Sequence, residues 1–468
     1  MPSEQKRAEI SRKQWLVLLA LMLGVFLGAL DISIVSPALP DIARDLNISD
    51  ALLSWIITLY ILVYVLAVPL MSSLSDKYGR KNVLLINIAL FAIGSLFAGF
   101  SQNLTHLLIA RGLQALGAGG LFPIASAVIG KTFPKERHGM ALGFIGMVWG
   151  VAAIIGPLIG GWMTQWYGWN SIFYVSFVLS LLVLVLIWKI LDKTMAVHPQ
   201  PFDWLGMGIL GAGLVMLTYG LNRVDVNILV ASIVVLVIFF FVEKYPKAPI
   251  IPLKFFRNSQ LNISFVLSFT RGMTEAGLVF LPFYAMVVLD IKAGLAGTLI
   301  IATAISMFLF TGPAGMLVDK VGAKKVLLFG ALVTGIGAAL MISANTLAEF
   351  IGYQLVLGLG LSAMSGAPIR YIVLHQTSER EKASAQSLVS LFSSFGIMVG
   401  SAIAGSMLAI ESKTGIGELA GFHKIYLMVA IILLVAALFV LGLDNKPAQP
   451  ESEPDFKAAG QKDQRGEA

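Results

Sequence analysis

The sequence contains no cysteine, and only 13% of its residues are charged. Without cysteine, disulfides and thiolate metal sites are excluded. The small charged fraction argues against a water-soluble protein, because a soluble globular protein carries about 25% charged residues. A chain of 468 residues with so few charges does not cover a water-soluble surface, so we expect its solvent to be lipid.

Signals for catalysis and for cofactors are missing as well. The five histidines are scattered without metal-ligand spacing, and no Ser/His/Asp set is indicated. The segment Ala125–Thr132 (ASAVIGKT) approaches a phosphate-binding loop, but Ala125 stands where such a loop needs glycine. We therefore expect no enzymatic activity, no catalytic residue, no cofactor and no metal. The net charge of +7 comes from short loops, so nucleic acid is not an expected partner.

Long apolar runs are what the sequence has in abundance. Hydrophobic residues make up 57% of it, and the mean hydropathy is +0.85. Runs of about 18 to 25 apolar residues are long enough to cross a ~30 Å hydrocarbon core as helices. We expect about fourteen such spans: Trp15–Leu39, Leu52–Ser72, Val83–Phe100, Leu104–Ile129, Met140–Met163, Ser171–Ile190, Trp204–Leu221, Asn227–Val242, Asn262–Leu289, Leu295–Leu317, Val326–Ala344, Leu347–Ile372, Ser384–Ala409 and Ile425–Leu443.

The basic residues gather in alternate loops. With fourteen spans, one side carries about 25 Lys and Arg residues and the other about five. The positive-inside rule then predicts a multi-pass protein of the cell membrane, plasma or inner, with both termini cytoplasmic. The expected organisation is a cytoplasmic N-terminus at 1–13, a six-helix bundle at 14–193, two inserted helices at 203–243, a second six-helix bundle at 260–443 and a disordered cytoplasmic tail at 444–468.

One short polar phrase occurs twice. LSDKYGRK begins at Leu74 and LVDKVGAKK begins at Leu317, so Asp319 follows Asp76 by 243 positions. Both phrases fall between the second and third spans of a six-span set. The separation fits a duplicated set with two spans inserted between the copies, and internal repeats are typical of transporters.

LSDKYGRKNVLL resembles the loop signature of the major facilitator superfamily, with Ser72 in place of the usual first glycine. The matching residues are Leu74, Asp76, Lys77, Gly79, Arg80, Lys81 and Leu84, and in the second copy Gly315, Leu317, Asp319, Lys320, Gly322, Lys324 and Leu327.

Three further segments resemble motifs of the same family. ARGLQALGAGG, with Arg111 and Gln114, is similar to its fourth-helix motif, and LDISIVSPALPDI, with Asp31, is similar to the first-helix motif of its fourteen-span drug:proton antiporters. The segment GFIGMVWGVAAIIGPLIGG resembles the fifth-helix antiporter motif through Gly143, Gly156, Pro157, Gly160 and Gly161. The resemblance implies an all-α polytopic membrane protein with two six-helix bundles plus two inserted helices.

Ionisable residues inside a bilayer are functional candidates by default, because each charge there costs several kcal/mol. Asp31 and Arg111 share a depth in the outer half of the membrane, and Arg271 and Glu275 lie on one helical face near mid-membrane. These four residues are the candidates for proton coupling, and the alternative is that they form permanent structural ion pairs. The resemblance implies that the arginine at position 111 helps to couple proton movement. Arg370 and Glu349 are expected at helix ends, where long side chains reach water.

The repeated loops are candidate gates. The resemblance implies that Asp76, Gly79, Arg80, Lys81, Asp319, Lys320, Gly322 and Lys324 latch the cytoplasmic ends of the helices in one state. The alternative, simple topogenic charge, explains the basic residues but not the aspartates and glycines. Candidates to face a substrate cavity, each of which has packing as its alternative, are Tyr60, Tyr64, Gln114, Trp149, Asn262, Phe269 and Tyr284.

We therefore expect a proton-coupled transporter that exports small amphipathic or lipophilic compounds (multidrug efflux, antibiotic resistance) by alternating access. Its partners are the substrate, protons and the lipid bilayer, and it works as a monomer. One alternative is an exporter of one specific metabolite or lipid. A non-transporting sensor or scaffold is disfavoured by the charges at mid-depth, and a membrane enzyme by the missing catalytic set.

Overall fold

The computed structural model describes residues 10–47, 55–192, 203–223, 225–245, 249, 251–278, 280–291, 297–379, 381–414 and 418–444. Most of the expected cytoplasmic N-terminus and nearly all of the expected tail lie outside these ranges. Within them, the regular structure is helical, and 11 helices are long and apolar enough to cross a membrane. Each of the fourteen expected spans falls mostly on helices, with breaks such as those at Val35, Gly120 and Ser365–Gly366.

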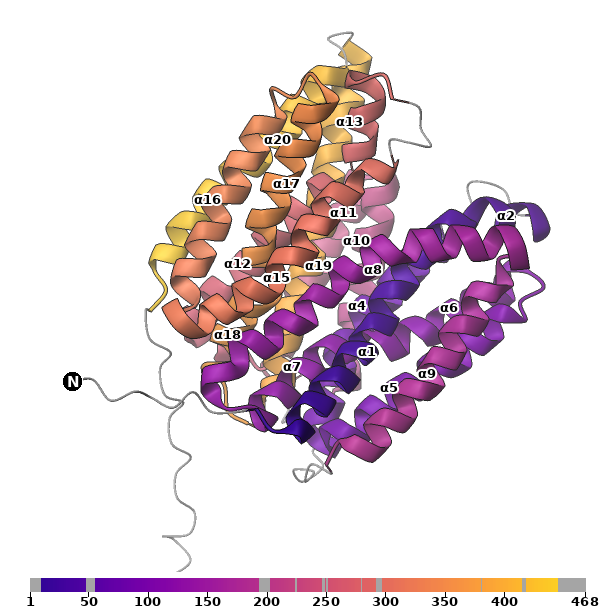
Figure 1. Ribbon diagram of the computed structural model, residues 1–468, viewed down its shortest axis with the longest axis vertical. Coiled ribbons are helices and arrows are strands. Elements are labelled where there is room, and N and C mark those ends of the chain that lie inside the picture. The colour runs from indigo at the N-terminus through magenta and orange to yellow at the C-terminus, as the bar shows by residue number, and fades with distance from the viewer. Residues whose placement is uncertain are drawn as a thin grey trace, which may run out of the picture.

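Two helical bundles lie side by side in Figure 1. The first, indigo to magenta, contains α1 (Arg12–Ile34), α2 (Leu39–Asp45), α4 (Trp55–Tyr78), α5 (Arg80–Gly99), α6 (Leu104–Gly119), α7 (Leu121–Thr132), α8 (His138–Tyr167) and α9 (Asn170–Ile190). The second, rose to yellow, contains α12 (Ser259–Leu278), α13 (Leu281–Val288), α15 (Ile301–Val321), α16 (Ala323–Met341), α17 (Leu347–Met364), α18 (Ala367–His375), α19 (Lys382–Thr414) and α20 (Glu418–Leu441).

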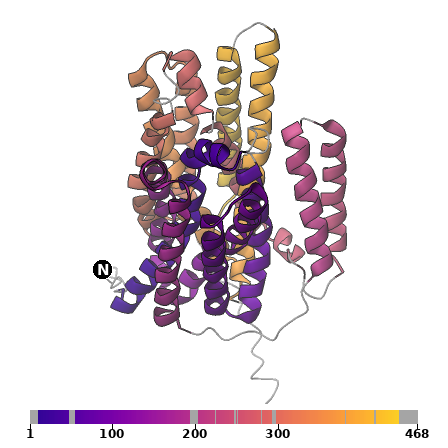
Figure 2. The same cartoon turned by 90° about the vertical axis from the view of Figure 1, so that its right-hand side faces the viewer.

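The inserted pair consists of α10 (Trp204–Arg223) and α11 (Val226–Val242), which pack on each other as a hairpin. Figure 2 shows the pair standing at the side of the two bundles. α10 contacts α4 and α19, and Phe240 of α11 packs against Phe256 in the segment that precedes α12. The apolar sequence of both helices matches a place at the lipid boundary, where large side chains such as Phe241 are exposed.

The two bundles repeat one packing scheme. In the first, α1 packs on α8 and α5 packs on α6 and α9; in the second, α12 packs on α19 and α16 packs on α17 and α20. The bundles meet through crossed pairs, α8 with α15 and α4 with α19. This exchange of equivalent helices gives the interface an approximate twofold relation, as expected from the duplicated sequence.

Local sequence explains where helices begin and bend. Ser11 and Gln14 form a capping box at the start of α1, and Thr346 and Glu349 form another at the start of α17. Proline inside a helix removes a backbone donor and bends the helix. This occurs at equivalent places in the two repeats, in α4 and α15, and again at Pro157 in α8.

Candidate functional site

At each copy of the repeated phrase a glycine ends a helix: Gly79 follows α4, and Gly322 follows α15. Gly79 has φ 93° and ψ 134°, and Gly322 has φ 90° and ψ 154°, a conformation that side chains with a Cβ rarely adopt. Each glycine therefore separates two long helices by a sharp turn. The two turns lie at the same end of the bundles, which we call the motif end, at the bottom of Figure 1.

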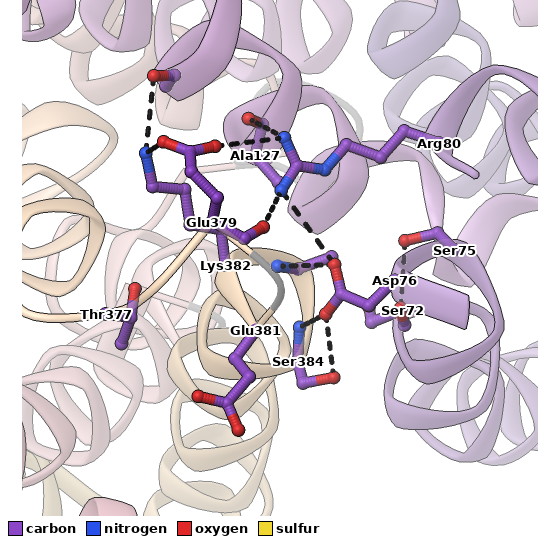
Figure 3. Close-up of polar contacts among 12 residues, drawn as sticks. Ser72, Ser75, Asp76, Arg80, Ala127, Thr377, Glu379, Glu381, Lys382 and Ser384 are labelled. Carbon is purple, nitrogen blue, oxygen red and sulfur yellow. Dashed lines mark hydrogen bonds and ion pairs between the residues drawn. The ribbon is translucent and has the colours of Figure 1, made fainter. Parts of the chain in front are cut away.

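Asp76 joins the first bundle to the second at the motif end. Its carboxylate accepts hydrogen bonds from the Ser384 backbone N–H and hydroxyl, both at 2.9 Å, and from the Ala383 N–H at 3.3 Å (Figure 3). These donors belong to the first turn of α19, where the helix presents unpaired N–H groups and partial positive charge. A carboxylate of one bundle thus caps a helix of the other.

Asp319 makes the equivalent contact in the opposite direction. Its two carboxylate oxygens accept from the backbone N–H groups of Gly139 and Met140, each at 2.7 Å, in the first turn of α8. Glycine is required there, since a Cβ on residue 139 would lie 2.6 Å from Asp319 Oδ1. The motif end therefore carries two crossed carboxylate caps.

The basic residues of the phrases fix the surrounding helices. Arg80 is 5% exposed and donates to the carbonyls of Ala127, at 2.9 Å, and Glu379, at 2.5 Å, so it too connects the bundles. Lys81 donates to the Trp188 and Leu191 carbonyls at the end of α9. Lys324 repeats this contact at the end of α20, while Lys320 is exposed.

Two histidines also meet across the bundles at the motif end. The rings of His138, at the start of α8, and His375, at the end of α18, have centroids 5.1 Å apart, and both residues are buried. Sequence reasoning missed this pair, because nothing in the spacing of two distant histidines indicates a contact.

Asp31 and Arg111 form a buried ion pair inside the first bundle. Arg111 Nη1 lies 2.5 Å from Asp31 Oδ2, and the residues are 1% and 0% exposed. Gln114 donates to Asp31 Oδ1 at 3.0 Å and to Ser95, and Tyr60 lies under the Arg111 guanidinium, 4.1 Å from it. Both side chains of the pair are thus enclosed by protein atoms in this conformation.

Arg271 and Glu275 of α12 also form an ion pair, but this pair keeps surface. Their side chains are 20% and 22% exposed. Arg271 donates further to Ser393 of α19 and, at 3.3 Å, to the Ser365 hydroxyl. Of the two pairs predicted from the sequence, only this one retains exposed side-chain surface.

The prediction that Arg370 reaches water is wrong, because the structure buries this residue. Instead of reaching water at a helix end, it is 5% exposed and packs between the bundles. Its guanidinium stands 3.8 Å from the ring centre of Phe122 of α7 and donates to Gln386 and Ser390 of α19. The helix breaks at Ser365 and Gly366, where Gly366 has φ 73°, so Arg370 belongs to the new helix α18 rather than to the end of a straight span. Glu349, by contrast, caps α17 in an exposed setting.

The cavity candidates divide into groups. Tyr60 and Gln114 belong to the Asp31 cluster, and Tyr284 is fully buried in the second bundle, where its hydroxyl donates to the Met341 and Ala344 carbonyls. Asn262 donates to the nearby Phe256 carbonyl. Partly exposed are Tyr64, Trp149 and Phe269.

The glycines of the α8 motif permit close helix contacts. A Cβ on Gly143 would lie 2.9 Å from Gly315 Cα in α15, and one on Gly160 would lie 3.0 Å from the Ile34 side chain in α1. Gly156 also faces α1, Gly161 has room, and Pro157 is exposed. One end of α8 thus contacts the other bundle and its far end contacts its own.

The sequence profile described as Major Facilitator Superfamily matches residues 21–312 and 263–464. The chain is 31% identical over 408 residues to the uncharacterized MFS-type transporter YfiU of Bacillus subtilis, covering 83% of this chain and 78% of that protein. It is 28% identical over 410 residues to the multidrug transporter protein MdtP of the same organism, covering 84% and 75%. It is 27% identical over 406 residues to the riboflavin transporter RibZ of Clostridioides difficile, covering 85% and 89%.

Solved structures show the same fold. The human organic anion transporter MFSD10 superposes with a TM-score of 0.72 at 14% identity, covering 92% of this chain and 100% of that chain. The proton:xylose symporter XylE gives 0.69 at 16% identity, covering 95% and 98%. The prediction of an all-α polytopic membrane protein with this fold is confirmed.

Proposed function

The chain belongs to the major facilitator superfamily, and from that premise we propose that it is a proton-coupled exporter of small amphipathic or lipophilic compounds. It would act as a monomer in the cell membrane, with the motif end and both termini in the cytoplasm. The relatives support export but do not identify the substrate, since they include a multidrug transporter, a multidrug resistance protein and an efflux pump.

The observation that carries the proposal is the crossed pair of carboxylate caps. Asp76 and Asp319 each hold the first turn of a helix in the other bundle through short hydrogen bonds. Such contacts are made or lost as a whole when the bundles rock, so the interface has two discrete states. In this conformation the motif end is closed, and opening it would expose the space between the bundles to the cytoplasm.

Proton coupling is assigned to the membrane carboxylates, with Glu275 ahead of Asp31. A carboxyl group that exchanges protons needs access to water in at least one state, and Glu275 has exposed surface whereas Asp31 has none. Burial opposes the charged form of a carboxylate and a nearby cation favours it, so a small change in surroundings shifts the balance at Glu275 beside Arg271. Arg111 would hold Asp31 and communicate between α1 and α6.

Uptake of a fluorescent dye into inverted vesicles with an imposed pH gradient tests the assignment. We expect Glu275→Gln to remove the dependence of uptake on the gradient, and Glu349→Gln, which changes an exposed capping residue, to preserve it. Undiminished gradient-driven uptake in a Glu275→Gln, Asp31→Asn double variant would rule out these carboxylates as the proton carriers.

An exporter of one defined metabolite on the same fold is the second candidate. The likeness to a riboflavin transporter favours it. A panel of dyes and metabolites distinguishes the two: accumulation of a single compound supports the specific exporter, and accumulation of several unrelated compounds supports the broad one.

A further inference from the structure

Two arginines, Arg271 and Arg370, lie against α19, and in the described part of the chain only Arg271 pairs with a carboxylate, that of Glu275. Arg370 donates to the Ser390 hydroxyl at 2.7 Å, and Arg271 donates to the Ser393 hydroxyl. Ser390 and Ser393 are three positions apart on α19, so they lie one above the other on one helix face. The two guanidinium groups are therefore neighbours along α19, and the titratable groups close enough to act on Arg370 are Arg271 and Tyr64.

The charges of this cluster do not balance. Glu275 neutralises Arg271 as an ion pair. The partners that the described residues offer to the Arg370 guanidinium are neutral, namely the carbonyl and side-chain oxygens of Gln386, the Ser390 hydroxyl and the face of Phe122. Among the described residues, no Asp or Glu pairs with it.

The buried, uncompensated positive charge of Arg370 is energetically unfavourable, which suggests that it serves a function. Arg370 is 5% exposed, and taking a cation out of water costs several kcal/mol unless an anion compensates it. Hydrogen bonds from neutral oxygens and the ring of Phe122 offset part of this cost, and both fix the guanidinium in place. A fixed, weakly hydrated guanidinium is the group that proteins use to recognise carboxylate and phosphate.

We propose that Arg370 is a binding site for the anionic group of the transported compound. The occupant is an amphipathic organic anion, with its carboxylate, sulfonate or phosphate against Arg370 and its flat apolar part along Phe122 and Tyr64. Both bundles contribute, Arg370 from the second and Phe122 and Tyr64 from the first, so binding at this place connects the two sides of the interface. This specifies the substrate class of the exporter and, in that respect, rests on the proposed function.

Binding of two xanthene dyes to the purified full-length protein tests the proposal without requiring transport. Fluorescein carries a negative charge and rhodamine 6G a positive one on similar ring systems, and fluorescence anisotropy reports their affinity. We expect the wild-type protein to bind fluorescein more tightly than rhodamine 6G. Arg370→Met should weaken fluorescein binding about tenfold or more, the loss expected for a charge-assisted hydrogen bond, and spare rhodamine 6G.

Arg370→Lys separates recognition from folding. Lysine keeps the positive charge but lacks the planar fork, so it should restore part of the fluorescein affinity that methionine loses. Lys189→Met is the matched control, because it removes an exposed cation in the last turn of α9 and should change neither dye. Retained rhodamine 6G binding shows that the Arg370→Met protein is folded.

The proposal is overturned by tighter binding of rhodamine 6G than of fluorescein in the wild type, or by equal fluorescein binding in the wild type and Arg370→Met. Neither result affects the proton-coupled export of cationic or neutral compounds. Conversely, Arg370-dependent fluorescein binding without gradient-driven transport would support the anion site while refuting the proposed function.

Discussion

Replacing Asp76 by asparagine should open the motif end. The carboxylate, whose side chain is 8% exposed, accepts three hydrogen bonds from α19 and lies 4.0 Å from Arg80. Hydrogen bonds to a buried charged group contribute about 1.5–3 kcal/mol, and a carboxylate at a helix N-terminus adds about 0.3–1 kcal/mol. Asparagine keeps one acceptor oxygen, so we expect the closed state to lose about 2 kcal/mol, which shifts the equilibrium towards opening about 30-fold.

Thiol labelling measures this shift, because the chain has no cysteine of its own. His375 is buried in the closed interface, so a single cysteine that replaces it should react only when the motif end opens. The labelling rate of the purified His375→Cys protein should therefore rise about 30-fold when Asp76→Asn is added. Asp192→Asn is the matched control. Asp192 lies at the same end, but its exposed ion pair with Lys13 joins two residues of the same bundle and does not cross the interface. Equal labelling rates with and without Asp76→Asn would refute the latch.

Three further changes should have distinct effects. Gly139→Ala places a methyl group 2.6 Å from Asp319 Oδ1 and should impair transport, whereas Gly112→Ala, with open space around it, should be neutral in the same dye-uptake assay. Asp31→Asn leaves the buried Arg111 charge unpaired and should lower stability by about 3–5 kcal/mol, seen as a lower melting temperature, and adding Arg111→Gln should recover part of it. Lys81→Met removes two hydrogen bonds to the end of α9 and should cost about 1 kcal/mol of stability by the same measurement; because both bonds lie within the first bundle, we expect near-normal transport, a result that would argue against the latch role implied for Lys81 by the resemblance.

The helices and their grouping were predictable, because lipid requires every backbone group to be paired within its own segment. Apolar length therefore located the spans, and the repeated phrase indicated the duplication. The i, i+4 spacing of Arg271 and Glu275 likewise anticipated an ion pair that the structure contains. In each case the information is local, or repeats at a fixed distance along the chain.

Contacts between distant segments were not predictable in the same way. The repeated phrase predicted a latch role for Asp76, but its hydrogen-bond partner Ser384 is 308 positions away and carries no signal of its own in the sequence. The position of Arg370 was misjudged because depth was counted along one straight helix, whereas the turn at Gly366 starts a new one. Tyr284 looked suited to a cavity, yet an aromatic residue with one polar atom suits a core equally well when two carbonyls accept its hydroxyl.

Locking the motif end in reconstituted liposomes tests the central claim, that rocking of the bundles couples substrate movement to protons. His138→Cys and His375→Cys replace two rings that stand 5.1 Å apart across the interface, and a short, reducible bifunctional reagent joins the two thiols. We predict that an imposed proton gradient drives dye transport, that this transport stops when the two cysteines are joined, and that it resumes after the reagent is reduced. Transport that continues in the joined protein, or that ignores the gradient throughout, would contradict the account.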